Sequence, residues 1–348
     1  MKKKNLKLIW QLVYIFGTIA LLYLLSYADP NFKRIGANIV NIQNRWFYLC
    51  FACVLGFWLV QTCVLKYIGH FMGEKLSFLR NLKITVIGEY YSAITPSSTG
   101  GQPMQLGCYK RYGVNLVKSS CILAIRFIGY TSSLCLLYII AMALHGAELY
   151  ARNTTMFYLS IVGFLINAVL MVSLILLLFN KALIERICRW LIKNITRLKP
   201  FRKREERWND KLDNGITDFS IAGEVLRHNL RKFIIVVLLS FASFLFLYSI
   251  PYFVYRAMGL AVYSYTTLFS MQVFLVLTVS YVPTPGAIGA SESAFFLFFA
   301  SLFPPESMYL AMMIWRLFSY YVGLIIGAIV VIWDEVYNMI TQKNKKDR

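Results

Sequence analysis

The chain has 348 residues, of which 58% are hydrophobic and only 15% are charged. Soluble proteins carry roughly 25% charged residues, and several apolar stretches here reach the roughly 18 residues that span a bilayer. The composition therefore excludes soluble folds and predicts an all-α polytopic membrane protein. The net charge of +20 does not indicate a nucleic-acid partner, because membrane proteins concentrate Lys and Arg on their cytoplasmic loops.

In chain order, six stretches are predicted to cross the membrane as uninterrupted helices. They are residues 8–28, 46–65, 119–143, 156–180, 233–255 and 308–333. No small-residue cleavage site follows the basic N-terminus, so the first stretch is expected to remain as a helix. Two further apolar regions, 84–112 and 268–303, are interrupted by Pro and Gly, which break helices. Depending on whether these two cross, the bundle has six to eight membrane helices.

The two interruptions resemble each other. The first reads Thr95-Pro96-Ser97-Ser98-Thr99-Gly100-Gly101-Gln102-Pro103, and the second reads Pro283-Thr284-Pro285-Gly286-Ala287-Ile288-Gly289-Ala290-Ser291-Glu292. Each contains Thr-Pro, and a lone Arg follows in an apolar span: Arg126 lies 30 residues after Pro96, and Arg316 lies 31 after Pro285. A Tyr follows each Arg by four residues. Matched halves that each contain a broken hydrophobic segment indicate a transporter-type site.

The distribution of positive charge predicts the topology. If both interrupted regions are re-entrant hairpins and the N-terminus is cytoplasmic, 29 of the 36 Lys and Arg lie on the cytoplasmic side and 5 outside. Cytoplasmic loops are enriched in these residues. We therefore expect a multi-pass membrane protein with both termini cytoplasmic and the two hairpins entering from opposite sides.

The whole chain, 1–348, is predicted to be one integral membrane domain. Its first repeat covers about 46–143 and its second about 233–333, and a basic cytoplasmic connector, 181–232, joins them. The connector holds 14 Lys and Arg. At 52 residues it is too short for an ordinary catalytic domain, which begins around 100 residues, and no soluble domain is expected at either end.

The interrupted segments are the predicted binding site. A broken helix exposes backbone groups that lipid tails cannot satisfy, and a helix N-terminus suits a phosphate group. The predicted headgroup-binding residues are Thr95, Pro96, Ser97, Ser98, Thr99, Gly100, Gly101, Gln102, Arg126, Thr284, Pro285, Gly286, Gly289, Glu292 and Arg316. The alternative is that both interruptions are kinks that only shape the bundle.

Two acidic residues lie close to the interruptions. A charge deep in a membrane span costs about 3 kcal/mol or more, so it is normally buried and paired. Glu89 precedes the first interruption and is predicted to form an ion pair or a gate with Arg126, and Glu292 is the matching partner for Arg316. The pairs either lock the hairpins to the bundle or leave the guanidinium groups to bind an anionic headgroup.

No catalytic or cofactor signal emerges. The three His are scattered, Cys50-x-x-Cys53 lies within an apolar span without a second pair, and there is no Walker sequence. We therefore expect no metal, no cofactor and no catalytic residues, with small hydrophobic roles for the cysteines. Transport would then be downhill, ion-coupled or driven by a partner.

The first interruption, with Thr95-Pro96 and its Gly-Gly-Gln-Pro, and the second, followed by the Arg316 span, resemble the lysylphosphatidylglycerol synthase transmembrane family. That family includes the flippase-like domain of the multiple peptide resistance factor, an antibiotic-resistance protein. The resemblance covers essentially the whole chain and implies a bundle of about eight membrane segments that moves lipids between leaflets. It also implies that the membrane is a bacterial cytoplasmic membrane. We expect no counterpart of the C-terminal synthase domain of the resistance factor in this chain.

We therefore expect a flippase-like translocator of an anionic or aminoacylated phospholipid. Two alternatives remain open. The first is a membrane component of phosphatidylglycerol lysyltransferase-type lipid modification that works with a separate soluble synthase. The second is a small-solute secondary transporter. A lateral groove open to the bilayer is typical of a lipid translocator, whereas an enclosed aqueous cavity is typical of a solute carrier. The sequence predicts no oligomeric state.

Overall fold

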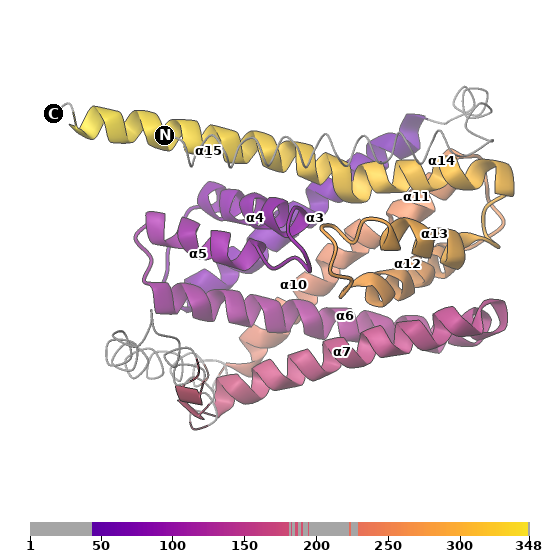
Figure 1. The fold of residues 1–348 in the computed structure, drawn as a ribbon, viewed down its shortest axis with the longest axis horizontal. Coiled ribbons are helices and arrows are strands. Elements are labelled where there is room, and N and C mark those ends of the chain that lie inside the picture. The colour runs from indigo at the N-terminus through magenta and orange to yellow at the C-terminus, as the bar shows by residue number, and fades with distance from the viewer. Residues whose placement is uncertain are drawn as a thin grey trace.

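A computed structural model describes residues 44–180 and 229–346, with a few single positions between them. The described part is helical (Figure 1). In chain order its elements are α3 (Asn44–Phe71), α4 (Phe78–Ala93), α5 (Gly101–Arg111), α6 (Leu116–Arg152), α7 (Thr154–Phe179), α10 (Leu230–Tyr248), α11 (Ile250–Ala257), α12 (Tyr265–Val279), α13 (Ala290–Phe299), α14 (Pro305–Arg316), the π-helical turn η2 (Leu317–Tyr321) and α15 (Val322–Lys346).

The described residues contain five helical segments long and apolar enough to cross a membrane. These are Arg45–Phe71, Leu116–Arg152, Thr154–Leu176, Leu230–Ala257 and Pro305–Val336. Each overlaps one of the predicted spans after the first, so the prediction of an all-α polytopic membrane protein is confirmed. The predicted span 8–28 and most of the connector 181–232 lie outside the described residues.

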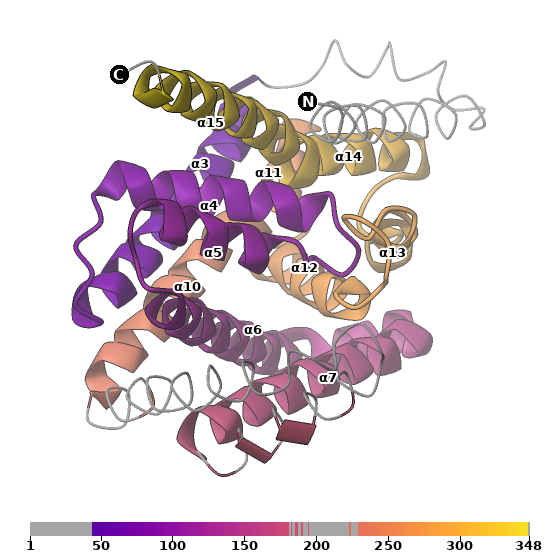
Figure 2. The same ribbon diagram turned by 60° about the vertical axis from the view of Figure 1, so that its left-hand side comes forward.

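Both interrupted regions form helical hairpins. Hairpin 1 is α4, a tip turn and α5; hairpin 2 is α12, a tip turn and α13. In Figures 1 and 2 the two hairpins lie in opposite halves of the molecule with their tips facing each other. Helices α4 and α12 have 16 and 15 residues, or about 22–24 Å at 1.5 Å per residue. That is less than the roughly 30 Å of a bilayer core, so each helix ends inside the bundle.

Local sequence sets where the hairpins begin. Ser77 precedes α4, and its hydroxyl accepts a hydrogen bond from the backbone N–H of Arg80. Ser264 precedes α12 and accepts from the backbone N–H of Thr267. Ser side chains commonly satisfy the first free N–H groups of a helix in this way. The two hairpins therefore start from the same kind of cap.

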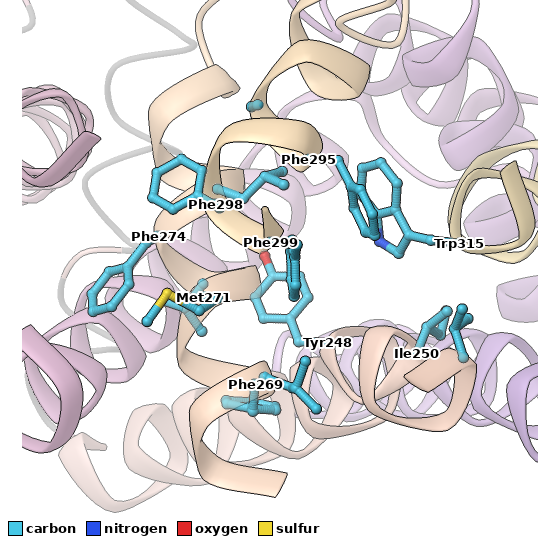
Figure 3. Packing of buried hydrophobic residues seen from close by; sticks show 14 of the residues in the cluster. Tyr248, Ile250, Phe269, Met271, Phe274, Phe295, Phe298, Phe299 and Trp315 are labelled. Carbon is cyan, nitrogen blue, oxygen red and sulfur yellow. The ribbon is translucent and has the colours of Figure 1, made fainter. Parts of the chain in front are cut away.

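Hairpin 2 packs within an aromatic core (Figure 3). The rings of Phe295 and Phe299 stack at 4.5 Å between centroids, and Phe295 stacks on Trp315 of α14 at 4.9 Å. Aromatic pairs at such distances stabilise packing beyond the area that they bury. Hairpin 1 lies in a second hydrophobic cluster. At its base, Asp334 of α15 forms ion pairs with Lys83 and Arg111.

The predicted span 308–333 is not one regular helix. It consists of α14, the π-helical turn η2 directly after Arg316, and the start of α15. In contrast, α6 runs without a break past Arg126. Single π-helical turns occur frequently at functional sites. The two arginine-bearing spans of the repeat therefore differ in their backbone, which residue spacing alone did not reveal.

Candidate functional site

The tips of the two hairpins meet at the centre of the bundle. Pro96 and Pro285 form an isolated antiparallel backbone bridge although 189 positions separate them in the sequence. These are the two prolines of the repeated Thr-Pro pair. The structure therefore brings the two predicted interruptions together into one site.

The two tip turns have matching hydrogen bonds. In hairpin 1 the carbonyl of Thr95 accepts from the N–H of Ser98 at 3.2 Å, and that of Pro96 accepts from Thr99 at 3.1 Å. In hairpin 2 the corresponding carbonyls are those of the second Thr-Pro pair. Thr284 O accepts from Ala287 N at 3.0 Å and Pro285 O accepts from Ile288 N at 3.2 Å. The repeat seen in the sequence is therefore also a repeat of backbone geometry.

Both turns place two successive residues at positive φ. Ser97 and Ser98 have φ of 48° and 55°, while Gly286 and Ala287 have 59° and 51°. Within the described residues, Ser97, Ser98 and Ala287 are all the non-glycine residues with positive φ. Such conformations cost roughly 1–3 kcal/mol each and cluster at functional sites. Their restriction to the two tips supports a site here.

A cavity of about 550 Å³ lies between the tips and the surrounding helices. Its polar lining includes the side chains of Ser97, Ser98 and Ser291, and its apolar lining comes from α3, α6 and α12. Glu89 is the one charged residue among the described residues that line it. Leu170 of α7 also lines the cavity and is 39% exposed. Because α7 is a candidate span, this part of the cavity wall belongs to a helix that is expected to contact lipid in a membrane.

Arg126 ties hairpin 1 to its neighbours. Its guanidinium donates to Glu89 Oε1 at 2.9 Å, to Gln61 Oε1 at 3.2 Å and to Gln105 Oε1 at 3.3 Å. The predicted pairing of Arg126 with Glu89 is confirmed. The side chains of this pair remain 13% and 31% exposed, and Glu89 faces the cavity. This pair therefore has one member within reach of a bound molecule.

Arg316 of α14 contacts both the tip turn and α13 of hairpin 2. Its Nε lies 2.7 Å from Glu292 Oε1, and its Nη2 donates to the carbonyl of Gly286 at 2.6 Å. The predicted partner is again confirmed, and both side chains are only 6% exposed. The guanidinium also lies 4.4 Å from the ring centroid of Tyr320, whose hydroxyl donates to Ala93 O of hairpin 1 at 3.1 Å. Arg316 thus holds the second tip, and Tyr320 joins the two hairpins.

The two helix N-termini at the tips are not equivalent. Glu292 Oε2 accepts from the N–H of Gly289 at 2.6 Å, so the start of α13 is already occupied by a carboxylate. The first turn of α5 contains no acidic residue. The N–H of Gly100, its N-cap, donates to Thr95 Oγ1 at 2.8 Å. A phosphate at a helix N-terminus would therefore meet a competing carboxylate in hairpin 2 but not in hairpin 1.

The predicted headgroup-binding residues divide into two groups. Those that line the cavity are Ser97, Ser98, Thr284 and Gly286, and Glu89 lines it as well. Those near the tips that do not line it are Thr95, Pro96, Thr99, Gly100, Gly101, Gln102, Arg126, Pro285, Gly289, Glu292 and Arg316. Neither arginine lines the cavity, and the guanidinium group of each contacts a glutamate. In this conformation they position the tips.

Sequence reasoning missed several residues of the site. Gln61 and Gln105 complete the surroundings of Arg126, and both are almost fully buried. The available signal was an amide side chain inside an apolar span, because polar groups there are costly and usually paired. The contact from Tyr320 to the opposite hairpin had no sequence signal beyond the matched spacing of the two tyrosines.

The His, Cys, Asp and Glu side chains of the described ranges 44–180 and 229–346 belong to the residue types that bind metal ions. No group of three His, Cys, Asp or Glu there is arranged to hold a metal ion. Cys50 and Cys53 are buried as free thiols in the hydrophobic core, as predicted for small hydrophobic residues.

Comparison with known proteins agrees with this architecture. Residues 8–327 match the family model described as the lysylphosphatidylglycerol synthase TM region. A UPF0104 membrane protein of Archaeoglobus fulgidus is 25% identical over 316 residues, which cover 88% of this chain and 91% of that protein.

Proposed function

This chain belongs to the family of the lysylphosphatidylglycerol synthase transmembrane region, and we propose that it moves an anionic or aminoacylated phospholipid between the leaflets of a bacterial cell membrane. The observation that carries this proposal is the cavity at the meeting point of the hairpin tips, with its edge at the exposed Leu170 of α7. A lateral opening suits a lipid, whose acyl chains stay in the bilayer while the headgroup crosses. An enclosed solute site would have no such edge.

The lining of the cavity suits a headgroup. Hydroxyl groups of Ser97, Ser98 and Ser291 replace part of the water that a polar headgroup loses on leaving the aqueous phase. Phe127 and Val276 belong to the apolar part of the wall. A cavity of about 550 Å³ lies in the range of small-molecule sites, roughly 300–1,000 Å³. The headgroup would bind between the tips with its chains directed toward α7.

The Arg126–Glu89 pair supplies the charge recognition. A headgroup phosphate competes with Glu89 for the guanidinium, which binds phosphate well through paired N–H donors. The amino group of an aminoacylated headgroup competes with Arg126 for Glu89. Either exchange opens this pair while the buried Arg316–Glu292 pair stays closed. Rocking of the two repeats about the Pro96–Pro285 contact then gives alternating access.

Reconstitution in liposomes tests the proposal. Fluorescent phospholipids with different headgroups are placed in both leaflets, and a membrane-impermeant quencher reports how fast the inner-leaflet fraction becomes accessible. We expect movement that depends on the headgroup. Gly323→Leu should stop it, because Gly323 lines the cavity and a Cβ there meets only Trp58, at 3.5 Å. Gly107→Leu is the matched control: a Cβ at Gly107 has no neighbour within 4 Å, and Gly107 lies outside the cavity lining.

Two outcomes would contradict the proposal. One is that the protein moves none of the labelled lipids, and the other is that both glycine variants are equally active. Folding of each variant is checked by its thermal unfolding in detergent, so that loss of movement is not confused with loss of the protein.

The family description favours a second candidate, a membrane component of lipid aminoacylation that works with a separate soluble synthase. Lipid extracts of cells that express the chain distinguish the two functions. A new aminoacylated lipid, lost when the soluble enzyme is removed, supports the second candidate. An unchanged lipid composition together with movement in liposomes supports translocation.

A further inference from the structure

A second cavity of about 550 Å³ lies at the opposite end of hairpin 1 from its tip, where α3 ends and α4 begins. It shares no lining residue with the cavity between the tips. Three basic residues line it, Lys66 and His70 of α3 and Lys75 of the connecting loop, together with apolar side chains that include Leu76 and Leu239. The cavity thus has a basic part and an apolar part.

The basic part keeps an excess of positive charge. Glu74 is the one carboxylate among the described lining residues, and it already pairs with Lys118 at 3.1 Å. Lys66 lies 5.9 Å from the ring centroid of Phe78, which fixes the direction of its side chain but leaves its charge uncompensated by an acid. Two lysines within one cavity therefore offer their charge to an anion.

The outer face of α3 leads into this cavity from the membrane. Its exposed positions Leu55 and Leu59 are 39% and 47% accessible, and the same face continues through Cys63 to the exposed Lys66 and His70. These positions follow one another at intervals of three or four residues, which places them on one side of a helix. Leu59 and Lys66 are separated by about 10 Å along the axis. The stripe changes from apolar to basic over that distance.

We propose that this cavity binds one anionic phospholipid of the adjacent leaflet. Its phosphate pairs with Lys66 and Lys75, and an acyl chain lies along the apolar stripe of α3. Basic pockets between membrane helices bind anionic lipid headgroups in this way. The leaflet is the cytoplasmic one under the topology predicted from the charges. The apolar stripe of α3 favours a lipid over a soluble phosphate compound, because only a lipid has an acyl chain that packs along the stripe.

Native mass spectrometry of the purified full-length chain tests this site. The probes are phosphatidylglycerol, the zwitterionic phosphatidylcholine, and glycerol 3-phosphate as a soluble headgroup. We expect retention of one phosphatidylglycerol, much weaker retention of phosphatidylcholine and none of glycerol 3-phosphate. The double variant Lys66→Gln and Lys75→Gln should weaken phosphatidylglycerol binding about tenfold or more. Lys110→Gln, an exposed lysine of α5 outside this cavity, should leave it unchanged.

Equal retention of phosphatidylglycerol by the double variant and by Lys110→Gln would overturn the proposal, as would equal retention of the two phospholipids. Binding of glycerol 3-phosphate at the same strength would identify a soluble anion as the ligand and would also overturn it. The site does not rest on the proposed transport activity. The liposome assay on the double variant separates the two, because the cavity between the tips is intact in that protein.

Discussion

The two hairpins share a tip but differ in how that tip is held. Their turns have the same hydrogen bonds and the same pair of positive φ angles, and they meet at Pro96 and Pro285. Hairpin 2 is held to α14 by the buried Arg316–Glu292 pair and packs in an aromatic core. In hairpin 1 the corresponding pair is partly open to the cavity. We infer that one repeated motif provides a fixed half and a half that responds to a ligand.

Removal of the buried Arg316–Glu292 pair should have the largest effect on stability. Arg316→Ala leaves Glu292 buried without its partner, and breaking a buried pair in this way typically costs about 3–5 kcal/mol. We expect a large fall in the thermal unfolding temperature in detergent. The double variant Arg316→Met and Glu292→Leu should recover much of the loss, because no charge then remains buried. A native unfolding temperature for Arg316→Ala would contradict the view of hairpin 2 as the fixed half.

The second-largest effect on stability is expected from substitutions at Gly286 and Ser97, which occupy corresponding positions in the two tip turns. Gly286→Ser puts a side chain at φ 59°, and its Cβ would clash with the ring of Tyr320. We expect a loss of about 1–3 kcal/mol or more. Ser97→Gly at the corresponding position of hairpin 1 relieves strain and should raise stability by up to about 1 kcal/mol. Unfolding temperatures that move in the same direction for both variants would show that the turns are not equivalent.

Removal of the Arg126–Glu89 pair should affect activity more than stability. Arg126→Gln removes a charge whose partner Glu89 is 31% exposed, so solvent in the cavity compensates part of the loss. We expect a cost of about 1–2 kcal/mol and loss of headgroup-dependent movement in liposomes. A variant that unfolds as readily as Arg316→Ala would instead make Arg126 a packing residue.

The smallest effect is expected at the contact between the hairpins. Tyr320→Phe keeps the ring beside Arg316 and removes the hydrogen bond to Ala93 O. A typical bond of this kind contributes about 0.5–1.5 kcal/mol. The unfolding temperature should fall slightly. If the transport rate changes strongly while stability does not, the bond controls how the two hairpins move relative to each other.

Much of this architecture could be predicted from the sequence. Long apolar stretches identified five spans that the structure contains, and the repeated Thr-Pro with a trailing Arg located both hairpins. The ion pairs followed from a simple argument, since an arginine in an apolar span needs an acid nearby. Hydrophobic pattern and charge were sufficient because the membrane leaves helices few alternatives.

The differences between the hairpins were not predictable in the same way. Glu292 is the last residue of its interruption and reaches both Arg316 and the N-terminus of α13, whereas Glu89 precedes its interruption and faces the cavity. Which face of a short helix a glutamate occupies depends on where the turn ends. The positive φ angles at the tips set where the turn ends. A Gly would have indicated such angles in the sequence, whereas the Ser-Ser pair of hairpin 1 does not.

The most direct test of the account compares Glu89→Gln with Glu292→Gln in the liposome assay, with the rate of movement expressed per folded protein. We expect Glu89→Gln to unfold at nearly the native temperature but to lose headgroup-dependent movement. Glu292→Gln should unfold at a lower temperature, while the protein that remains folded moves lipid at the native rate. A native rate for Glu89→Gln would contradict the assignment of the open pair as the part of the site that recognises the headgroup.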